Sequence, residues 1–356
     1  MSLASRRRIV VAGAGAVGAS IAYHLALEGE RDVVLVERGE VAGGATAKAM
    51  GGVRQQFSTA PEVRLAQASI DFFNELGPPF FERVGYLFLA TTPDGLTELE
   101  ERRKLQAGLG VPVEHADPSA LVPGLRADDI LCAVWCAADG VANPPAVTYE
   151  LVRRATELGV TLRRHTDARA VEGDVLVIAC GPNSAELAAE RGVQLPIRPL
   201  CRQLVQTTPV NSVPERLPMT IEAETGFHFR RRGEHLLLAM AEPEPRWGFE
   251  ETVDWHFAAD LLRRLHRRLP PAGDAEIANA WAGLYDMTPD AHPIVGRVAD
   301  GVYVCAGFSG HGFMQSPAVG RALAEEIVRG SASFDLSPFR LERFDSGATF
   351  PERLVL

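Results

Sequence analysis

Two glycine-rich segments, one near each end of the chain, have residue types and spacing suited to binding an anionic ligand. The C-terminal one, Gly307–Phe313 (GFSGHGF), follows an apolar run over 301–306 that predicts a strand. After it comes a helical pattern with Ser316 at the N-cap and Pro317 at the first helical position, ending at Arg329. A strand, a glycine turn and a helix N-terminus together present free N–H groups and a positive dipole end. We therefore predict an anion-binding turn, the alternative being a tight turn that only packs the helix.

The N-terminal segment has the organisation of a dinucleotide-binding unit. The sequence GAGAVG at 13–18 lies between a predicted strand over 8–11 and a predicted helix over 19–28. A second strand, 32–36, ends in Glu37. The three glycines suit a tight turn, close approach of a pyrophosphate and close helix–strand packing, and the glutamate suits ribose hydroxyls. The whole pattern predicts a Rossmann-type βαβ unit.

Other segments favour FAD over NAD as the dinucleotide. After the second strand, residues 43–54 form a long run rich in small residues that is able to lie flat against a planar ring. The run 174–182 predicts a strand that arrives at Gly181, another position of close approach. Together with the C-terminal glycine loop, these segments predict one extended ligand, FAD. An NAD-dependent dehydrogenase is the weakest alternative.

Longer motifs follow the same segments: GVRQQF at 52–57, GYLFL at 85–89, WAGLYDMTPD at 281–290, and GFSGHGFM at 307–314 followed by PAVG at 317–320. They resemble the D-amino-acid-oxidase-like (DAO) superfamily of flavoproteins, and most of all the β-subunits of sarcosine oxidase and dye-linked L-proline dehydrogenase. The resemblance implies an α/β fold with a Rossmann-like FAD-binding domain of the glutathione-reductase/D-amino-acid-oxidase type. It also implies an α+β substrate domain with a mainly antiparallel sheet.

Both domains are expected to be discontinuous. We assign residues 1–84, 139–197 and 281–356 to the FAD-binding domain, and residues 85–138 and 198–280 to the substrate domain. Alternating apolar residues predict the strands of the substrate domain. These strands cover residues 86–89, 202–207, 226–230 and 235–240.

Departures from the family pattern bear on the chemistry. Gly283 stands where monomeric sarcosine oxidases carry the cysteine of a covalent flavin link, which implies non-covalent FAD. Met314 replaces a lysine that helps those oxidases hold the substrate carboxylate, and no lysine occurs near 235–238, where they place the lysine that activates oxygen. We therefore expect a dehydrogenase. Lys48, in the loop expected beside the flavin, is the observation against this.

The resemblance implies an oxidoreductase that oxidises the C–N bond of a small amino acid or amine. The expected substrate is a secondary or N-methylated amino acid, sarcosine- or proline-like, converted to an imine by hydride transfer to flavin N5. N–H groups of the Gly307 loop are suited to stabilise negative charge on reduced flavin. One alternative is an oxidase of the sarcosine or glycine oxidase kind that produces hydrogen peroxide. Another is an FAD-binding subunit of a hetero-oligomer with an assembly or electron-relay role. The electron acceptor, the partner subunits and homo-oligomerisation stay open.

Four residues are candidates for catalysis. Arg54 has the fork geometry that binds a carboxylate, although a structural ion pair or a flavin contact explains it equally well. His228, between two phenylalanines, either faces the substrate or is a buried histidine with satisfied hydrogen bonds. Tyr285 is expected at the flavin edge, and His311 is expected to fix its loop rather than act as a base. The expected cofactor-binding residues are Gly13, Gly15, Ala16, Val17, Gly18, Glu37, Arg38, Gly44, Ala45, Thr46, Lys48, Met50, Gly51, Gly52, Cys180, Gly181, Gly283, Gly307, Gly310, His311, Gly312, Phe313 and Met314.

Composition excludes several other classes of function. The 356 residues carry a formal net charge of -10, which argues against a nucleic-acid partner. No apolar run approaches the ~18 residues of a membrane span, and no signal peptide is evident, so we expect a cytoplasmic protein without an integral membrane segment. The five cysteines are odd in number and scattered in apolar context, without partner histidine or cysteine pairs, so buried structural thiols are expected and no metal site. They are Cys132, Cys136, Cys180, Cys201 and Cys305.

Overall fold

The computed structural model describes residues 7–353. Contacts between residues divide the chain into two units, each built from segments distant in sequence. Unit 1 contains the described part of Met1–Ala49, together with Asn143–Pro199 and Tyr285–Pro351. Unit 2 contains Met50–Ala142, Leu200–Leu284 and the described part of Glu352–Leu356. The outer limits expected for the FAD-binding domain, residues 1 and 356, lie outside the described residues.

The segment 50–84, expected from the sequence to be part of the FAD-binding domain, belongs to unit 2. Its two short strands, β3 (Gly52–Val53) and β4 (Phe81–Glu82), both pair antiparallel with β8 (Gly140–Ala142) in a three-stranded sheet. Between them lies α3 (Ala60–Leu76), which contacts β4. Strands of two or three residues have no readable periodicity, and their common partner lies far along the chain. The pairing that sets this boundary therefore leaves no local signal in the sequence.

Unit 1 is built on a six-stranded sheet with the order β17-β18-β10-β1-β2-β9. All its pairings are parallel except that of the edge strand β17 with β18. Every residue of the central strands β1, β2 and β10 is buried, as expected for strands covered on both faces. The strands are β1 (Ile9–Ala12), β2 (Val33–Val36), β9 (Thr161–Arg163), β10 (Val175–Ile178), β17 (Ile294–Ala299) and β18 (Val302–Ala306).

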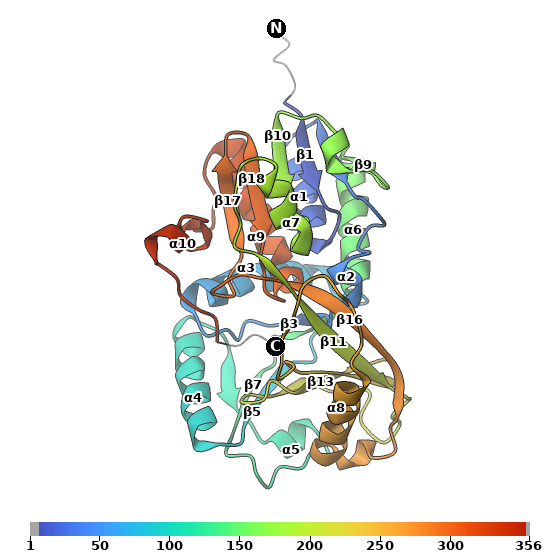
Figure 1. The fold of residues 1–356 in the computed structure, drawn as a ribbon. Helices are drawn as coiled ribbons and strands as arrows, with labels where there is room; N and C mark the ends of the chain where they lie inside the picture. The colour runs from blue at the N-terminus through green and yellow to red at the C-terminus, as the bar shows by residue number, and fades with distance from the viewer. Residues whose placement is uncertain (1–6, 354–356) are drawn as a thin grey trace. The chain divides into compact units, whose positions relative to one another are not determined.

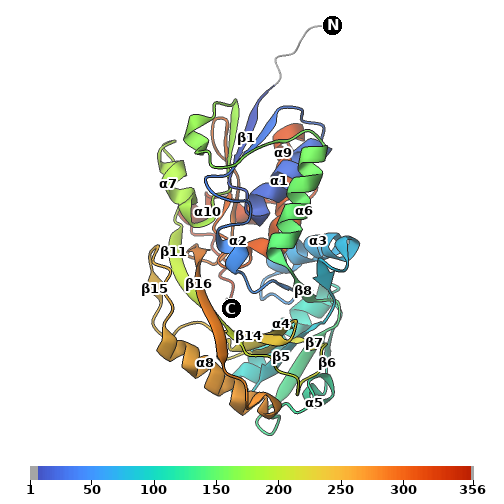
Figure 2. The same cartoon turned by 90° about the vertical axis from the view of Figure 1, so that its right-hand side faces the viewer.

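Helices cover both faces of this sheet. Figure 2 shows α1, α6 and α9 along one face and the short α7 on the other. The backbones of α1 and α9 approach closely at Gly320, where an added Cβ would lie 2.2 Å from Ser20 Oγ. The helices of unit 1 are α1 (Ala16–Leu27), α2 (Ala45–Lys48), α6 (Pro144–Glu157), α7 (Ser184–Ala189), α9 (Gly312–Arg329) and α10 (Arg343–Ser346).

Both helices that follow glycine loops begin earlier than the sequence predicts. Helix α1 begins at Ala16 rather than residue 19, and α9 begins at Gly312 rather than at Pro317. Pro317 lies inside α9 and has no N–H to donate to the carbonyl of Phe313, four residues earlier. The Ser316 hydroxyl donates to that carbonyl instead, at 2.9 Å. The serine is therefore not an N-cap, and the glycine loop runs directly into the helix.

Unit 2 is organised around a nine-stranded sheet that is mainly antiparallel (Figure 1). Its order is β15-β11-β14-β13-β12-β5-β7-β6, with β16 also paired to β11, and the β12–β5 pairing is parallel. The strands are β5 (Tyr86–Ala90), β6 (Val113–His115), β7 (Cys132–Cys136), β11 (Arg198–Thr207), β12 (Met219–Glu222), β13 (His228–Arg232), β14 (His235–Ala239), β15 (Arg246–Trp247) and β16 (Ile277–Met287).

Three further helices belong to unit 2: α4 (Pro93–Gly108), α5 (Pro118–Leu121) and α8 (Trp255–Arg268). The apolar face of α8 packs into a core that includes Phe229 of β13 and Leu238 of β14. The start of α8 is capped by Asp254, whose carboxylate accepts hydrogen bonds from two N–H groups of the first turn. Within residues 7–353, no helix is both long and apolar enough to cross a membrane.

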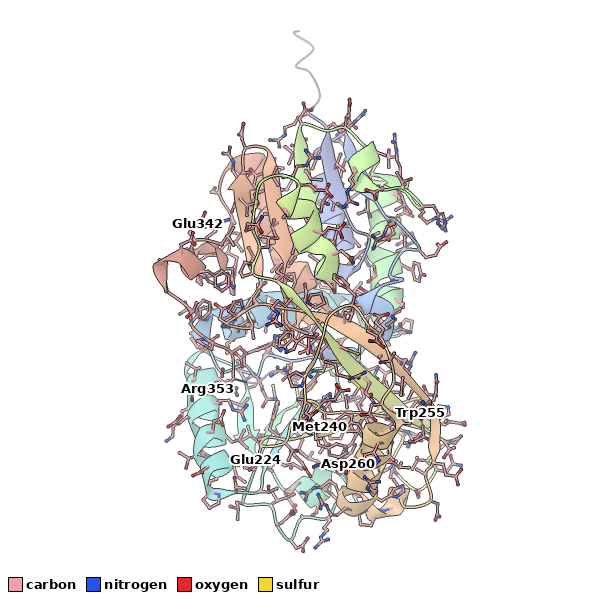
Figure 3. All side chains as sticks on the ribbon, viewed as in Figure 1. Glu224, Met240, Trp255, Asp260, Glu342 and Arg353 are labelled. Atoms are coloured by element: carbon pink, nitrogen blue, oxygen red, sulfur yellow. The ribbon has the colours of Figure 1, made fainter. Side chains whose placement is uncertain are left out.

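The start of α4 is fixed by a carboxylate from elsewhere in unit 2. Glu224, labelled in Figure 3, accepts hydrogen bonds from the N–H groups of Thr91 (2.7 Å) and Thr92 (2.9 Å). The Thr92 side chain in turn accepts from the N–H of Gly95 at 3.1 Å. An added Cβ on Gly95 would lie 2.0 Å from Glu224 Oε1. This end of the helix is therefore held by polar contacts to the turn between β12 and β13.

Candidate functional site

The glycines of the N-terminal motif are required by the packing of unit 1. Gly13 has φ +101°, and an added Cβ would lie 2.4 Å from the carbonyl oxygen of Ala179. At Gly18 the added Cβ would lie 1.8 Å from the oxygen of Gly13. Gly15 is the N-cap of α1, and its added Cβ would approach Thr46 Oγ1 to 3.2 Å. The first and third glycines therefore allow the turn and the helix–strand packing, while the second keeps the helix entrance open.

Side chains of two predicted cofactor residues lie at this turn. One oxygen of Glu37 accepts from the N–H of Ala14 at 2.9 Å and the other from the N–H of Gly39 at 2.7 Å. The hydroxyl of Thr46, from α2, accepts from the N–H of Ala16 at 3.2 Å. An ionised carboxylate offers about four lone-pair sites, so Glu37 retains capacity to accept from ribose hydroxyls.

The entrance to α1 fits the pyrophosphate of a dinucleotide. Its N-cap residue is a glycine, and its first turn contains no acidic residue, so no side chain of that turn neutralises the positive end of the helix dipole. Cys180 follows β10 by two residues, and its thiol donates to the carbonyl of Ala12 at 3.4 Å. Burial raises the pKa of this thiol to about 12. Gly181 follows with φ +52°. The residues present in this part of unit 1 thus fit the adenosine diphosphate half of FAD.

Asp286 fixes the C-terminal glycine loop. Its carboxylate accepts from the N–H of Gly307 at 2.7 Å, and its backbone oxygen accepts from the N–H of Ser309 at 3.1 Å. The Ser309 hydroxyl in turn accepts from the N–H of Thr288 at 3.1 Å. Burial raises the pKa of Asp286 to about 6. Sequence reasoning missed this residue although it lies in the WAGLYDMTPD motif, because its partner is 21 residues away.

Tyr285 and Thr288 pack against glycines of the same loop. An added Cβ at Gly310 (φ +96°) would lie 2.4 Å from Tyr285 Cε2, and one at Gly307 (φ +79°) would lie 2.5 Å from Thr288 Cγ2. His311 is the buried N-cap residue of α9, and its N–H donates to a carbonyl of the loop at 3.0 Å. Unit 1 therefore brings together the predicted residues Tyr285 and His311 with the loop between β18 and α9.

A buried ion pair stabilises the segment that follows Tyr285. The Arg343 guanidinium donates to both oxygens of Asp290, at 2.8 and 2.9 Å, and to the carbonyl of His292 at 2.8 Å. Both charged side chains are almost fully buried. Asp290 therefore has a structural partner that fixes the turn after β16.

In unit 2, polar contacts hold the segment 50–57 in place. Arg230 Nε donates to the carbonyl of Met50 at 2.7 Å. The hydroxyl of Tyr86 occupies the space beside Gly52, since an added Cβ there would lie 1.7 Å from the hydroxyl oxygen. Any residue larger than glycine at position 52 would therefore require the Tyr86 side chain to move.

Asp139 is the main anchor of this segment and was not singled out from the sequence. It accepts from the backbone N–H and side-chain amide of Gln55, both at 3.0 Å, and from the side-chain amide of Gln56 at 3.1 Å. Burial raises the pKa of Asp139 to about 6, against the effect of these hydrogen bonds. The side chains of Gln55 and Gln56 in the GVRQQF motif are therefore held in place by a carboxylate 83–84 residues later in the chain.

Arg54 is buried in unit 2, with 1% of its surface exposed. Its guanidinium donates to the carbonyl of Gln56 and lies 4.2 Å above the ring of Phe57. Burial lowers the pKa of Arg54, and the nearby carboxylate of Glu352 opposes that effect. These contacts give Arg54 a structural role within its own segment.

His228 is also buried in unit 2, with 5% of its surface exposed. Its Nδ1 lies 2.7 Å from the carbonyl oxygen of Gly226, which requires the proton on Nδ1 and leaves the lone pair on Nε2. Burial lowers the pKa of His228 to about 4, and the charge of Arg54 acts in the same direction. The imidazole is therefore neutral at pH 7.

The structure distributes the predicted site residues over both units. In unit 2 are Met50, Gly51, Gly52, Arg54, His228 and Gly283. In unit 1 are Gly13, Gly15, Ala16, Val17, Gly18, Glu37, Arg38, Gly44, Ala45, Thr46, Lys48, Cys180, Gly181, Tyr285, Gly307, Gly310, His311, Gly312, Phe313 and Met314.

Comparison with known proteins agrees with these features. A family model described as DAO, FAD dependent oxidoreductase, matches residues 8–326. The crystal structure of L-proline dehydrogenase from P. horikoshii superposes with a TM-score of 0.90 at 27% identity, covering 96% of this chain and 98% of that one. Glycine oxidase from Geobacillus kaustophilus is 28% identical over 371 residues, 95% of this chain and 97% of that protein.

A longer relative is similar over only part of its length. The 4-methylaminobutanoate oxidase (formaldehyde-forming) of Paenarthrobacter nicotinovorans is 28% identical over 374 residues, which is 95% of this chain but 45% of that protein. The chain therefore spans less than half of this relative. The matches confirm the predicted family and the predicted α/β fold with a mainly antiparallel second sheet. From the family match over most of its length, the chain belongs to the DAO family of FAD-dependent oxidoreductases.

Proposed function

We propose that this protein binds FAD non-covalently and oxidises the C–N bond of a small secondary or N-methylated amino acid, or a similar amine, to an imine. The named activities of its relatives support this substrate class, since they include an L-proline dehydrogenase, a glycine oxidase and a 4-methylaminobutanoate oxidase. We further propose that it works as a dehydrogenase that passes electrons to an acceptor other than oxygen.

The observation that carries the proposal is the glycine loop at 307–310 and its junction with α9. The loop is fixed by the hydrogen bond from the N–H of Gly307 to the Asp286 carboxylate, and α9 begins only two residues after Gly310. The first turn of α9 contains no acidic residue. A positive helix end on a rigid glycine loop is suited to negative charge that develops on a cofactor during a reaction.

FAD, when bound, would supply the hydride acceptor, and the chain would supply binding and orientation. In unit 1 the α1 entrance and Glu37 would hold the adenosine diphosphate half, and the Gly307 loop would hold the ring system. In unit 2 we assign Gly51 and Gly52 to ring contact. Arg54 would attract the substrate carboxylate. The Nε2 lone pair of neutral His228 would accept a hydrogen bond from the substrate amine.

Three features of the chain support a dehydrogenase that binds FAD non-covalently. Gly283, in β16, has no thiol with which to form a flavin link. Met314 lies in the first turn of α9, where monomeric sarcosine oxidases have a carboxylate-binding lysine. Strand β14 contains no lysine. Lys48 is the last residue of α2, in the segment between the N-terminal glycine motif and Gly51, and is the residue to test if oxygen proves to be the acceptor.

The decisive experiment is an anaerobic screen of purified protein with amino acids and N-methyl amines, following loss of the oxidised flavin absorbance. Bleaching by a sarcosine- or proline-like compound is the expected result. Bleaching by none of them, in protein that contains stoichiometric FAD, would overturn the assigned substrate class and support an assembly or electron-relay subunit. Acid precipitation should release the flavin into the supernatant, and a coloured pellet would refute non-covalent binding.

The choice of acceptor needs a separate measurement with the substrate found in that screen. We expect fast turnover with an artificial dye and slow formation of hydrogen peroxide in air. Comparable rates with oxygen and dye would identify an oxidase instead.

A further inference from the structure

Three potential metal ligands converge in unit 2, outside the segments discussed above. Glu100 is on α4, His115 ends β6 and Cys132 begins β7. His115 Nε2 contacts Glu100 Oε1 directly, and Cys132 Sγ lies 3.6 Å from the same oxygen. The three ligand atoms all lie within 4.8 Å of one another.

The sheet register explains why the histidine and the cysteine meet. Strands β6 and β7 are antiparallel, with His115 opposite Val134. Side chains alternate between the faces of a strand, so Cys132, two residues from Val134, points to the same face as His115. Helix α4 packs against both strands and adds the carboxylate of Glu100 to this pair.

The carboxylate of Glu100 is oriented by Arg103 on the next turn of α4. Arg103 donates to Oε2 from Nε at 3.1 Å and from Nη2 at 3.0 Å. This leaves Oε1 directed toward the imidazole and the thiol. Metal-binding carboxylates are themselves usually hydrogen-bonded, and those outer partners set their orientation. The contacts of Glu224 restrain the start of the same helix.

We propose that Glu100, His115 and Cys132 form a binding site for a divalent transition metal ion with the ligand preference of Zn²⁺. Sulfur, imidazole nitrogen and carboxylate oxygen are the ligand atoms that zinc takes, at ~2.3, ~2.0 and ~2.1 Å respectively. Bonds of that length in a tetrahedron place the ligand atoms roughly 3.5 Å apart, close to the 3.6 Å between Cys132 Sγ and Glu100 Oε1. His115 Nε2, which is in direct contact with Glu100 Oε1, would have to move away from that oxygen. Three protein ligands leave one position for water, and the thiolate and carboxylate together balance the charge of the ion.

Metal binding changes the protonation of Cys132 and the hydrogen bonding of His115. The metal–sulfur bond replaces the S–H bond of Cys132, and the proton goes to solvent. His115 must bind through its Nε2 lone pair, so the hydrogen bond from His115 to Glu100 is exchanged for two metal bonds. More than half of the His115 side chain is exposed, so its ring has room to make this adjustment.

The first test is a Zn²⁺ titration of the chelator-treated, FAD-loaded protein against a chromophoric zinc chelator. We expect one tightly bound ion per chain. The substitutions Cys132→Ser and His115→Ala should each weaken binding by more than the ~100-fold upper limit typical of outer partners, and Arg103→Leu by roughly 10–100-fold. His165→Ala is the matched control, because His165 Nε2 lies 3.0 Å from Glu40 Oε1 in an exposed pair, and this variant should bind like the unchanged protein.

The second test uses the unchanged protein and does not depend on how the variants fold. Zn²⁺ should protect Cys132 from alkylation, measured by mass spectrometry of its peptide, and protection should be lost in His115→Ala. Equal zinc affinity in Cys132→Ser and the unchanged protein would overturn the proposal. So would unprotected Cys132 at saturating Zn²⁺, or an equal loss of binding in the His165→Ala control.

Discussion

The carboxylate of Asp286 accepts a 2.7 Å hydrogen bond from the backbone N–H of Gly307 and so ties the end of β16 to the start of the C-terminal glycine loop. Both residues are in unit 1, and the carboxylate is buried. The loop therefore has its conformation set before any ligand binds, by a group that carries a titratable proton.

The free energy of unfolding should depend on whether Asp286 is protonated. The pKa of Asp286 is raised to about 6 from an ordinary value of 3.8, so between these pH values the folded state binds more protons than the unfolded state. The contribution of this group to the free energy of unfolding should therefore fall as the pH rises from about 4 to 6, by at most ~3 kcal/mol. Asp286→Asn should lack this dependence.

The measurement is urea unfolding of both proteins at several pH values across that window. Asp300→Asn, which changes a fully exposed carboxylate, is the control and should follow the unchanged protein. A constant stability difference between Asp286→Asn and the unchanged protein at all pH values would contradict the assignment.

Gly52 and Tyr86 should be energetically coupled. In Gly52→Ala the new methyl group would lie 1.7 Å from the tyrosine hydroxyl oxygen, so we expect a loss of about 1–3 kcal/mol from overpacking. Tyr86→Phe removes that oxygen and should restore part of the loss in the double variant, seen as a coupling energy in chemical denaturation. Gly108→Ala, with no atom within 4 Å of the new Cβ, should be close to neutral. Strict additivity of the two substitutions would refute the contact.

Asp139 should matter for the substrate through the segment it anchors. Asp139→Ala removes the acceptor of three hydrogen bonds from Gln55 and Gln56, next to Arg54. On the proposed function, we expect KM for a carboxylate-bearing amine to rise about tenfold or more, since tenfold corresponds to ~1.4 kcal/mol of lost binding. A primary or secondary amine without a carboxylate should be affected less. Equal effects on both substrates would argue against Arg54 as the carboxylate contact.

The Arg343–Asp290 pair should be important for stability. Arg343→Met leaves a buried carboxylate without its partner, so the free energy of unfolding should fall by about 3–5 kcal/mol. Replacing both partners by apolar residues should recover much of this loss. Removal of the exposed partner in the Arg297–Asp300 pair, by Asp300→Ala, should leave the free energy of unfolding close to that of the unchanged protein. Similar losses in the two pairs would contradict the role of burial.

Much of the fold could be predicted because its signals are local. The buried strands of unit 1 are continuous apolar runs, and the turn at Gly13 has a spacing fixed by its mechanics. The start of α9 was predicted wrongly because Ser316-Pro317 has the sequence of a helix N-terminus. In the structure the same serine instead satisfies the carbonyl that the proline leaves without a donor.

Other features depend on partners far apart in sequence. Asp286 and Asp139 act on residues 21 and 84 positions away, and no local pattern identifies either as an anchor. The expectation of no metal site concerned all five cysteines and rested on the lack of partner histidine or cysteine pairs in the sequence. In the structure the register of β6 and β7 brings His115 close to Cys132, and the packing of α4 brings Glu100 to both. Such groupings follow from strand pairing and helix packing, which a single sequence does not specify.

The strand order of unit 1 also has a consequence for synthesis of the protein. β10 lies between β1 and β18 in the sheet, but β18 is not made until on the order of a hundred further residues have been added, which takes roughly ten seconds on a ribosome. β10 (Val175–Ile178) can already pair with β1 on one side during that interval. Its other edge, which later pairs with β18, has no partner strand in the nascent chain. Unpaired edges of this kind invite pairing between molecules. Yield of the intact protein should therefore depend on translation rate and on chaperones that shield the growing chain.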